Sequence, residues 1–456
     1  MKFVQQSRRE PRYFENEDGS TYLPIGLNLC FIRDSERRTE EENLGIYRSW
    51  MTEFAKNGGN FIRIWLGVPF FDIMPERAGE FSEKNLSHIR FVVDLAEKLG
   101  IRIKFTLEHF RRIGDGNDPE GFPGVVDFHK PLYQGMVSNM REYLASAECR
   151  RLYLAKAQRL ADAGFGESKA VIAWELWNEI NCIGGGKETE QWSEYMIEKL
   201  SGIFPHQMIV QNLGSFSGAT AYLCYDPLAR LSGNGFLQVH RYLDPGAELD
   251  VCRGAMDVLC ADSIRELHDR NAHCPLILAE CGAVEANHAR YSDLYALDKE
   301  GTLLHDMLFA PFFAGSAGCG QPWHWDHLYI QRHHLLFHFA RFAEAVSGVD
   351  PVEEAFVPYH TETHSLRILG LRGRHQTLMW CRDKRSDWKS ELVERNAAEV
   401  LRGERIPLEG NGKCVCYLPW EDRKIPGSIR DGWCELPEFR RSIVIKQIKE
   451  DVVYEK

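Results

Sequence analysis

The sequence lacks several features that would point to common functions. Residues 1–9 lack the apolar segment of a secretory signal, and no apolar run of the sequence reaches membrane-spanning length. No basic cluster stands out among 55 Lys and Arg against 66 Asp and Glu, a formal charge of −11. CxxC pairs, a glycine-rich phosphate loop, low-complexity tracts and short repeats are also missing. We therefore expect neither a nucleic acid nor a membrane as a partner.

Cysteine is plentiful but unpatterned. The 13 cysteines are scattered and odd in number, and without an export signal they predict reduced thiols in a cytosolic protein, mostly small buried side chains. The length of 456 residues exceeds one ordinary domain but fits a large barrel with a smaller appendage. The 11 tryptophans could pack on sugar rings, although core packing is the commoner use of this residue.

The first two thirds of the chain alternate short apolar runs with amphipathic stretches, as strands followed by helices do. Eight alternations predict an α/β fold, a closed parallel (β/α)8 TIM barrel. The Gly/Asp/Pro-rich segment 114–124 predicts a surface loop near a site. The longer segment from about 110 to 130 could wall off one end of a cleft. The expected strands are 22–29, 61–66, 101–107, 171–176, 208–210, 236–239, 276–279 and, more weakly, 315–321, and the clearest expected helices are 46–55, 91–99 and 335–345.

The pattern changes after residues 347–351, where helical periodicity fades. Short strand-like runs at 366–369, 377–381, 414–418 and 443–445 are separated by turn residues. They predict a small antiparallel β-domain. We therefore place the barrel at residues 1–348 and a β-sandwich-like domain at residues 349–456.

Two glutamates stand at the carboxyl ends of predicted strands. Glu179 closes the run 174–179, Trp-Glu-Leu-Trp-Asn-Glu, and Glu280 closes the run 275–280, Pro-Leu-Ile-Leu-Ala-Glu. Parallel barrel strands end on one face, where active sites are built, so the two side chains could meet there. A pair of carboxylates is what glycosidic bond cleavage requires, one as an acid and one as a base or nucleophile. An arbitrary Glu is more often an exposed loop residue, and it is the pairing that favours function.

The motif Trp177-Asn178-Glu179 resembles the strand-four signature of the clan A glycoside hydrolases, which include the family 5 cellulases and mannanases. In that clan the Glu of Asn-Glu is the general acid/base and a Glu ending strand seven is the nucleophile. Residues 277–282 are similar to the usual strand-seven ending, except that Cys281 replaces a common aromatic residue. The resemblance covers roughly residues 12–347 as one barrel, and some clan members also carry a C-terminal β-sandwich.

Further positions match this clan residue by residue. The resemblance makes Arg63 the strand-two arginine that bonds the nucleophile, and gives the amide of Asn178 to a sugar 2-hydroxyl. Each has an ordinary alternative, since Arg63 could be a rim residue, Asn178 a turn residue, and a histidine simply structural. The remaining matches are His109 on strand three, His240 and Tyr242 on strand six, and either Trp323 or Trp325 as the floor of the sugar subsite.

The resemblance implies a retaining β-glycosidase without a cofactor or metal, acting by double displacement on β-linked oligosaccharides or glycosides of gluco or manno type. Glu280 would attack the anomeric carbon, and Glu179 would protonate the leaving oxygen and then activate water. Barrels with β-domains often self-associate, so a homo-oligomer stays open as an alternative to a monomer.

Two other readings compete with this one. A metal-dependent barrel hydrolase could use His324, Asp326 and His327 with the pair His333 and His334, although their spacing matches no familiar ligand motif. A non-catalytic barrel could bind glycans by stacking alone. The presence of both glutamates argues against the second alternative, since stacking on a sugar requires neither of them.

Overall fold

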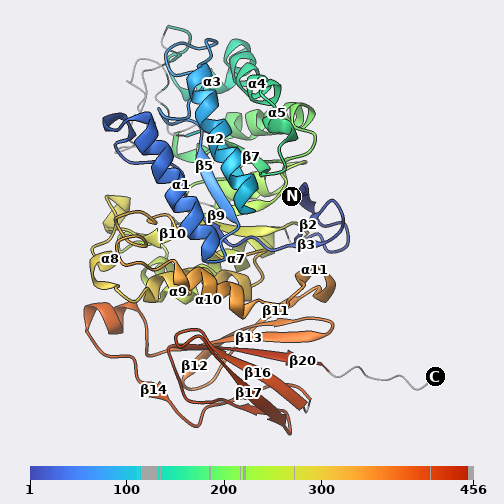
Figure 1. Cartoon of the computed structure of the whole chain (residues 1–456), viewed down its shortest axis with the longest axis vertical. Helices are drawn as coiled ribbons and strands as arrows, with labels where there is room; N and C mark the ends of the chain where they lie inside the picture. The colour runs from blue at the N-terminus through green and yellow to red at the C-terminus, as the bar shows by residue number, and fades with distance from the viewer. Residues whose placement is uncertain are drawn as a thin grey trace, which may run out of the picture.

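A computed structural model describes residues 1–109, 111, 113, 132–133, 135–183, 186–215, 217–218, 222–271, 273–410 and 412–449. The parallel strands and their helices fill the upper part of Figure 1, and the C-terminal antiparallel sheet lies below them. Within these ranges no helix combines the length and the apolar character needed to cross a bilayer. The loop expected at 114–124 lies outside the described residues.

A ring of parallel strands forms the barrel. Five strands pair side by side in the order β4-β5-β6-β7-β8, and β9 pairs with β10. The barrel strands are β4 (Gly26–Leu27), β5 (Phe61–Trp65), β6 (Arg102–Glu108), β7 (Val171–Trp177), β8 (Met208–Val210), β9 (Leu237–Leu243) and β10 (Leu276–Ala283).

Backbone bonds outside the named strands close this ring. Bridges join Ile209 to Asn234 and Ser215 to His240, which link the β8 side to β9. The segment 317–322 takes the place of the eighth strand, because it bonds to both of its neighbours. Its bonds run from Gln321 N–H to the Leu278 carbonyl (3.0 Å) on β10 and from Cys319 N–H to the Pro24 carbonyl (3.2 Å) next to β4. The predicted (β/α)8 barrel is confirmed.

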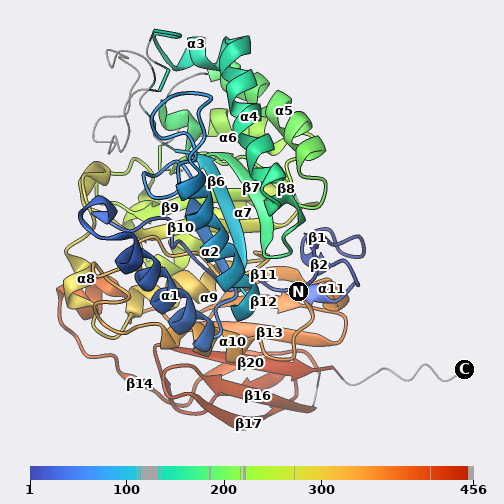
Figure 2. The same cartoon turned by 45° about the horizontal axis from the view of Figure 1, so that its top comes forward.

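Helices cover the outside of the ring, and Figure 2 shows α2 and α5 lying over β6, β7 and β8. Local signals define the helix ends. Thr39 and Glu42 form a capping box at the start of α1, and Gly100 ends α2 in the left-handed conformation at φ 74°. The helices of this part are α1 (Glu40–Lys56), α2 (Glu83–Leu99), α3 (Met140–Ala145), α4 (Ala147–Asp162), α5 (Gly186–Ile203), α6 (Tyr222–Ala229), α7 (Met256–Arg270), α8 (Leu294–Leu297), α9 (Thr302–Phe313) and α10 (Phe337–Ala345).

The largest difference from the sequence-based strands is at the N-terminus. The run expected at 22–29 contributes only the two residues of β4 to the barrel, because Tyr22 belongs to β3 of a separate antiparallel sheet. Strands β9 and β10 instead extend further than expected, so that His240 and Glu280 lie inside the strands rather than after them. The small antiparallel sheet consists of β1 (Val4–Gln6), β2 (Phe14–Asn16) and β3 (Thr21–Tyr22).

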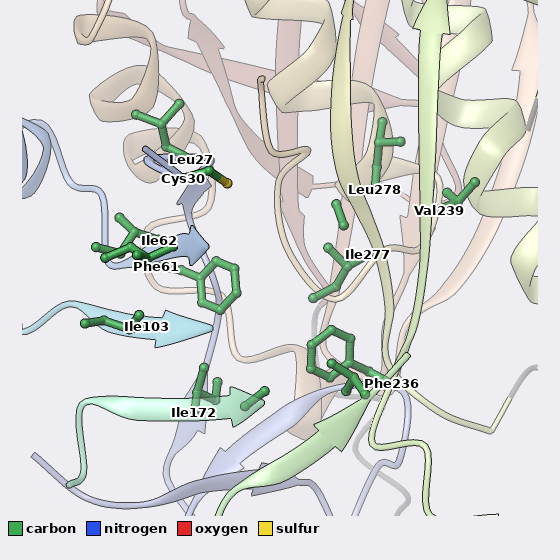
Figure 3. Packing of buried hydrophobic residues seen from close by; sticks show 14 of the residues in the cluster. Leu27, Cys30, Phe61, Ile62, Ile103, Ile172, Phe236, Val239, Ile277 and Leu278 are labelled. Atoms are coloured by element: carbon green, nitrogen blue, oxygen red, sulfur yellow. The ribbon is translucent and has the colours of Figure 1, made fainter. Parts of the chain in front are cut away.

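Apolar side chains fill the lower part of the barrel. In Figure 3 the ring of Phe61 on β5 and the ring of Phe236, just before β9, face each other across the interior, and Ile277 of β10 lies beside Phe236. All three are buried. Burying side chains of this size stabilises the fold by about 1.5–3 kcal/mol each relative to exposure. This packed floor holds the strand ends that carry the polar residues described below.

The C-terminal strands form one antiparallel sheet of order β11-β12-β13-β20-β16-β17-β18-β15, accompanied by the pair β14-β19. The short helix α11 (Pro351–Glu354) leads into it. The strands are β11 (Val357–Glu362), β12 (Leu366–Arg372), β13 (Gln376–Asp383), β14 (Val400–Leu401), β15 (Arg405–Pro407), β16 (Gly412–Leu418), β17 (Arg423–Arg430), β18 (Trp433–Glu435), β19 (Phe439–Arg440) and β20 (Ser442–Ile448).

Residues alternate between two hydrophobic cores along this sheet. Trp380 and Val444 point to the barrel core, whereas their neighbours Cys381 and Ile445 point to a second core enclosed by the sheet itself. Helix α9 lies between barrel and sheet and is buried all round, which explains its largely apolar sequence. The boundary also contains a fully buried ion pair, in which Arg382 Nε donates to Asp306 Oδ1 over 2.8 Å.

We predict that Arg382→Ala destabilises the protein by about 3–5 kcal/mol, because it leaves the Asp306 carboxylate buried without its partner. Urea unfolding measures the change. Arg402→Ala is the matched control, since both members of its ion pair with Glu438 are exposed and the pair should contribute about 0–1 kcal/mol. Equal losses of unfolding free energy in the two variants would show that the buried pair stabilises the protein no more than an exposed pair does.

Candidate active site

Glu179 and Glu280 converge at one rim of the barrel. Glu179 follows β7 immediately, and Glu280 lies within β10. One oxygen of each carboxylate and one ring nitrogen of His240 all lie within 4.8 Å of one another. Glu280 is buried, and the Glu179 side chain is 14% exposed. The structure therefore brings the two sequence-predicted carboxylates together across the mouth.

A strained turn aims Glu179 inward. Its φ of 48° is in the left-handed region, which costs a residue with a side chain on the order of 1–3 kcal/mol. The Glu179 N–H donates to Asn212 Oδ1 (3.0 Å), and the Glu179 carbonyl accepts from Cys182 N–H (2.8 Å). These bonds hold the unusual conformation. Asn212 was not among the predicted site residues, and no local signal marks it, since it follows β8 in an ordinary loop.

The same asparagine defines the tautomer of His240. Because Asn212 Oδ1 accepts from the Glu179 backbone, its Nδ2 is the atom that donates to His240 Nε2 (2.9 Å). His240 Nδ1 therefore carries the proton and donates to Glu179 Oε1 (2.6 Å), with Glu280 Oε2 at 3.3 Å. Burial lowers the pKa of His240 to about 4, so this ring is a neutral donor between the two carboxylates.

Arg63 on β5 binds Glu280. Its Nη1 pairs with Glu280 Oε1, and its Nη2 donates to Asn178 Oδ1 over 2.6 Å. Tyr242 O–H donates to the other carboxylate oxygen of Glu280 at 2.6 Å. Burial, reinforced by the charge of Glu280, raises the pKa of Tyr242 well above its ordinary value, so the phenol stays protonated and keeps donating. The contacts of Arg63 and Tyr242 with Glu280 are the ones that the resemblance implies, whereas the bond from Arg63 to Asn178 was not expected.

Below this layer lies a third carboxylate, which was not predicted from the sequence. Glu175 is buried in β7, where it pairs with Arg63 Nη2 and with Lys104 Nζ at 2.8 Å. Burial opposes its ionisation, but Arg63 and Lys104 outweigh it and lower the pKa of Glu175 to about 2. The available signal was a Glu inside an otherwise apolar strand. Its fixed negative charge anchors the second arm of the Arg63 guanidinium.

Burial raises the pKa of Glu179, partly opposed by the positive charges of His288 and Arg63. His288 is another residue that the sequence did not indicate. It follows β10 in the short helix η5 (Ala286–His288), and its ring stands edge-on to Tyr242 with centroids 4.5 Å apart. Burial lowers the pKa of His288, which reduces the share of the charged ring beside Glu179.

Aromatic side chains line one side of the site. Trp65 lies two residues after Arg63 on β5. The centroid of its ring lies 5.0 Å from the ring centroids of His109 and Trp323. Trp323 is half-buried, and its backbone N–H donates to the carbonyl of Cys281, the residue after Glu280 (2.9 Å). Trp325 is instead buried, and its ring lies 3.9 Å from that of Trp50 on α1. The structure thus places Trp323 near the carboxylates and Trp325 in the packing behind them.

The residues proposed for a metal-dependent hydrolase do not assemble as a ligand cluster. His324 Nδ1 bonds to the Tyr295 hydroxyl (2.9 Å), Asp326 pairs with Arg33 (2.8 Å), and His327 is exposed. Over the described ranges, the clusters with ligand-like spacing are the Glu179, His240, Glu280 group and a cysteine group in the C-terminal sheet. In the first, His240 Nδ1 carries a proton and Nε2 faces Asn212, so neither nitrogen offers a lone pair to a metal.

Comparison with known proteins agrees with this architecture. No protein-family model matches the chain. Mannan endo-1,4-beta-mannosidase 1 of Oryza sativa subsp. japonica is 22% identical over 301 residues, which cover 58% of this chain and 66% of that protein. The chain therefore spans just under two thirds of the length of this curated relative.

Solved structures show the same fold at low identity. A glycoside hydrolase superposes with a TM-score of 0.60 at 11% identity, covering 100% of this chain and 98% of its own. A family 5 glycoside hydrolase from Bacteroides vulgatus gives a TM-score of 0.57 at 13% identity, covering 100% and 95%. An exo-beta-1,4-mannosidase from Opitutaceae bacterium strain TAV5 gives 0.50 at 16%, covering 74% and 61%. The resemblance to clan A barrels is confirmed at the level of the fold, and the first two matches include the C-terminal sheet.

Proposed function

We propose that this chain is a retaining β-glycosidase that hydrolyses β-linked oligosaccharides or glycosides, with manno- and gluco-configured sugars as first candidates. The observation that carries the proposal is the approach of Glu179 and Glu280, whose carboxylate oxygens lie within 4.8 Å. Retaining enzymes hold their two carboxyl groups about 5–5.5 Å apart, whereas inverting enzymes leave roughly 6.5–9.5 Å for a water molecule. The mannosidase relative supports the choice of sugar.

Glu280 is the proposed nucleophile. Arg63 and Tyr242 both donate to its carboxylate, so its negative charge is stabilised and its oxygens are oriented. In the first step Glu280 attacks the anomeric carbon while the bond from that carbon to the leaving oxygen breaks. The product of this step is a glycosyl ester of Glu280.

Glu179 is the proposed acid and base. Its raised pKa keeps more of it protonated near neutral pH than an exposed Glu would be, so it can give its proton to the leaving oxygen. The resulting carboxylate then takes a proton from water, and the hydroxide so formed cleaves the ester. The Nδ1–H of His240 donates to Glu179 and stabilises the charge that appears when the proton leaves.

Asn178 and Trp323 are the proposed contacts to the sugar. Arg63 occupies the Asn178 amide oxygen, which leaves the amide nitrogen as the group to donate to a sugar 2-hydroxyl. This bond would strengthen as positive charge develops at the anomeric carbon. The half-buried ring of Trp323 is the proposed stacking surface. His109, which packs on Trp65, is a proposed neighbour of the cleaved sugar.

Location and domain limits are also proposals. The described cysteines are free thiols, which supports a reducing compartment such as the cytosol. A division into residues 1–348 and 349–456 is supported by α10, which ends at Ala345, and by the start of the antiparallel strands at Val357.

We predict that Glu280→Gln lowers kcat on aryl β-mannosides or β-glucosides by on the order of 10³–10⁶, because an amide cannot form the ester intermediate. Steady-state kinetics measure this loss, and circular dichroism confirms folding. Glu194→Gln, an exposed change on α5, is the matched control and should keep full activity. Substantial turnover by the Glu280 variant would reject the nucleophile assignment.

The first-formed product should keep the β-configuration, because two successive inversions at the anomeric carbon cancel. Proton NMR of the anomeric signal during early hydrolysis distinguishes the anomers before mutarotation mixes them. An α-product would contradict double displacement and the close carboxylate pair on which it depends.

Asn212→Asp should move the alkaline limb of the kcat/KM profile to higher pH by roughly one unit. Activity requires protonated Glu179 and is lost as pH rises through its pKa. Aspartate cannot donate to His240 Nε2, so the ring proton moves to Nε2, and Nδ1 no longer stabilises ionised Glu179. The pKa of Glu179 therefore rises. Asn139→Asp, a change at the N-cap of α3, is the control. A uniform loss of activity with an unmoved limb would mean that Asn212 only supports the fold.

A further inference from the structure

A trio of cysteines meets inside the C-terminal sheet, remote from the barrel rim. Cys414 and Cys416 lie on β16, and Cys434 lies on β18. Their three sulfurs lie within 4.8 Å of one another, with Cys414 Sγ and Cys434 Sγ 3.5 Å apart. All three residues are buried. Figure 1 shows β16 and β17 in the lower part of the molecule.

A glycine makes this meeting possible. Strand β17 runs between β16 and β18, and a side chain on it would separate the sulfurs. Gly427 stands opposite Cys414 on β17, and a Cβ at this position would lie 2.6 Å from Cys414 Sγ and 3.1 Å from Cys416 Sγ. The missing side chain leaves the space in which the three thiols converge. Ordinary packing of small apolar residues would not require the sulfurs of non-adjacent strands to touch.

The spacing suits a shared cation. A metal ion held at about 2.3 Å from each sulfur separates the sulfurs by roughly 3.8–4.0 Å, within the range that the trio already spans. Cys414 and Cys416 point to the same face of β16, and the sulfur of Cys434 lies next to theirs. The sulfurs therefore need to move little to bind one ion.

A cavity lies near the trio, although none of the three cysteines lines it. This cavity of about 770 Å³ opens between the edge strands β11 and β15, with Tyr359 and Pro407 in its lining. The lining also includes Thr377 and Gln447, and Gln447 stands directly opposite Cys414 in the strand register. The cavity therefore reaches Gln447 on β20, the neighbouring strand of β16, at the position that pairs with Cys414.

We propose that Cys414, Cys416 and Cys434 form a three-thiolate site for a soft closed-shell cation, Cu(I) or Zn(II). Thiolate sulfur prefers these ions over hard cations such as Mg²⁺ and Ca²⁺. Three sulfurs complete a three-coordinate Cu(I) site, whereas Zn(II) requires a fourth ligand such as a water molecule. Binding displaces the thiol protons, so it releases protons to the solvent and weakens as the pH falls. The site is independent of the proposed glycosidase activity.

Metal retention tests the proposal. The full chain, kept reduced, is loaded separately with Cu(I) and with Zn(II), passed through a desalting column and analysed for metal by mass spectrometry. We expect the wild type to retain roughly one equivalent of at least one ion and to show a raised Tm with it. Cys414→Ser and Cys434→Ser should lose both effects. Cys381→Ser removes a buried thiol from the same core but outside the trio, so it should retain both.

A second measurement uses the unmodified chain, in case the serine variants fail to fold. The loaded and metal-free proteins are alkylated under partial denaturation, and the modified cysteines are mapped by peptide mass. Protection confined to Cys414, Cys416 and Cys434 supports the site. Retention of neither ion by the wild type, or protection spread over unrelated cysteines, overturns it.

Discussion

The buried guanidinium of Arg63 is the constraint on which the site depends. It pairs with Glu280 on β10 and with Glu175 on β7, and it donates to Asn178. Its Nε donates to Thr106 Oγ1 on β6 (3.1 Å). One side chain therefore ties together strands on different sides of the barrel. Removing a single member of such a buried charged group costs several kcal/mol, because the remaining charges lose their compensation.

The charges inside the barrel form a balanced set around this arginine. Arg63 and Lys104 supply two positive charges, and Glu175 and Glu280 supply two negative ones, all of them buried. Glu175 binds Nη2 of Arg63 and so orients the guanidinium. The Nη1 group therefore already points at Glu280. Glu179 stands outside this set and bonds to neutral His240 instead. The two carboxylates thus have different environments although they are close together, which is what different roles in one reaction require.

Much of the site could be predicted because parallel strands share an edge. Glu179 and Glu280 each end an apolar run, and this alone places them on one rim. Strands β9 and β10 were underestimated because His240 and Glu280 interrupt the apolar pattern while the backbone ladder continues. Asn212 and His288 could not be found, since their roles depend on contacts between loops that are distant in sequence. Trp323 and Trp325 have the same local pattern, and only packing against Trp50 separates them.

The C-terminal sheet shows the same limit. Short strand-like runs predicted β12, β13, β16 and β20. Register and strand order are set by distant pairings, so the convergence of Cys414 and Cys434 over Gly427 left no local trace.

The central claim is that Glu280 becomes covalently glycosylated. A 2-deoxy-2-fluoro-β-mannosyl or β-glucosyl fluoride tests it most directly, because the fluorine slows the second step and lets the ester accumulate. Peptide mass spectrometry should find one sugar attached to the peptide that contains Glu280. A label on Glu179 or on any other carboxylate would contradict the account.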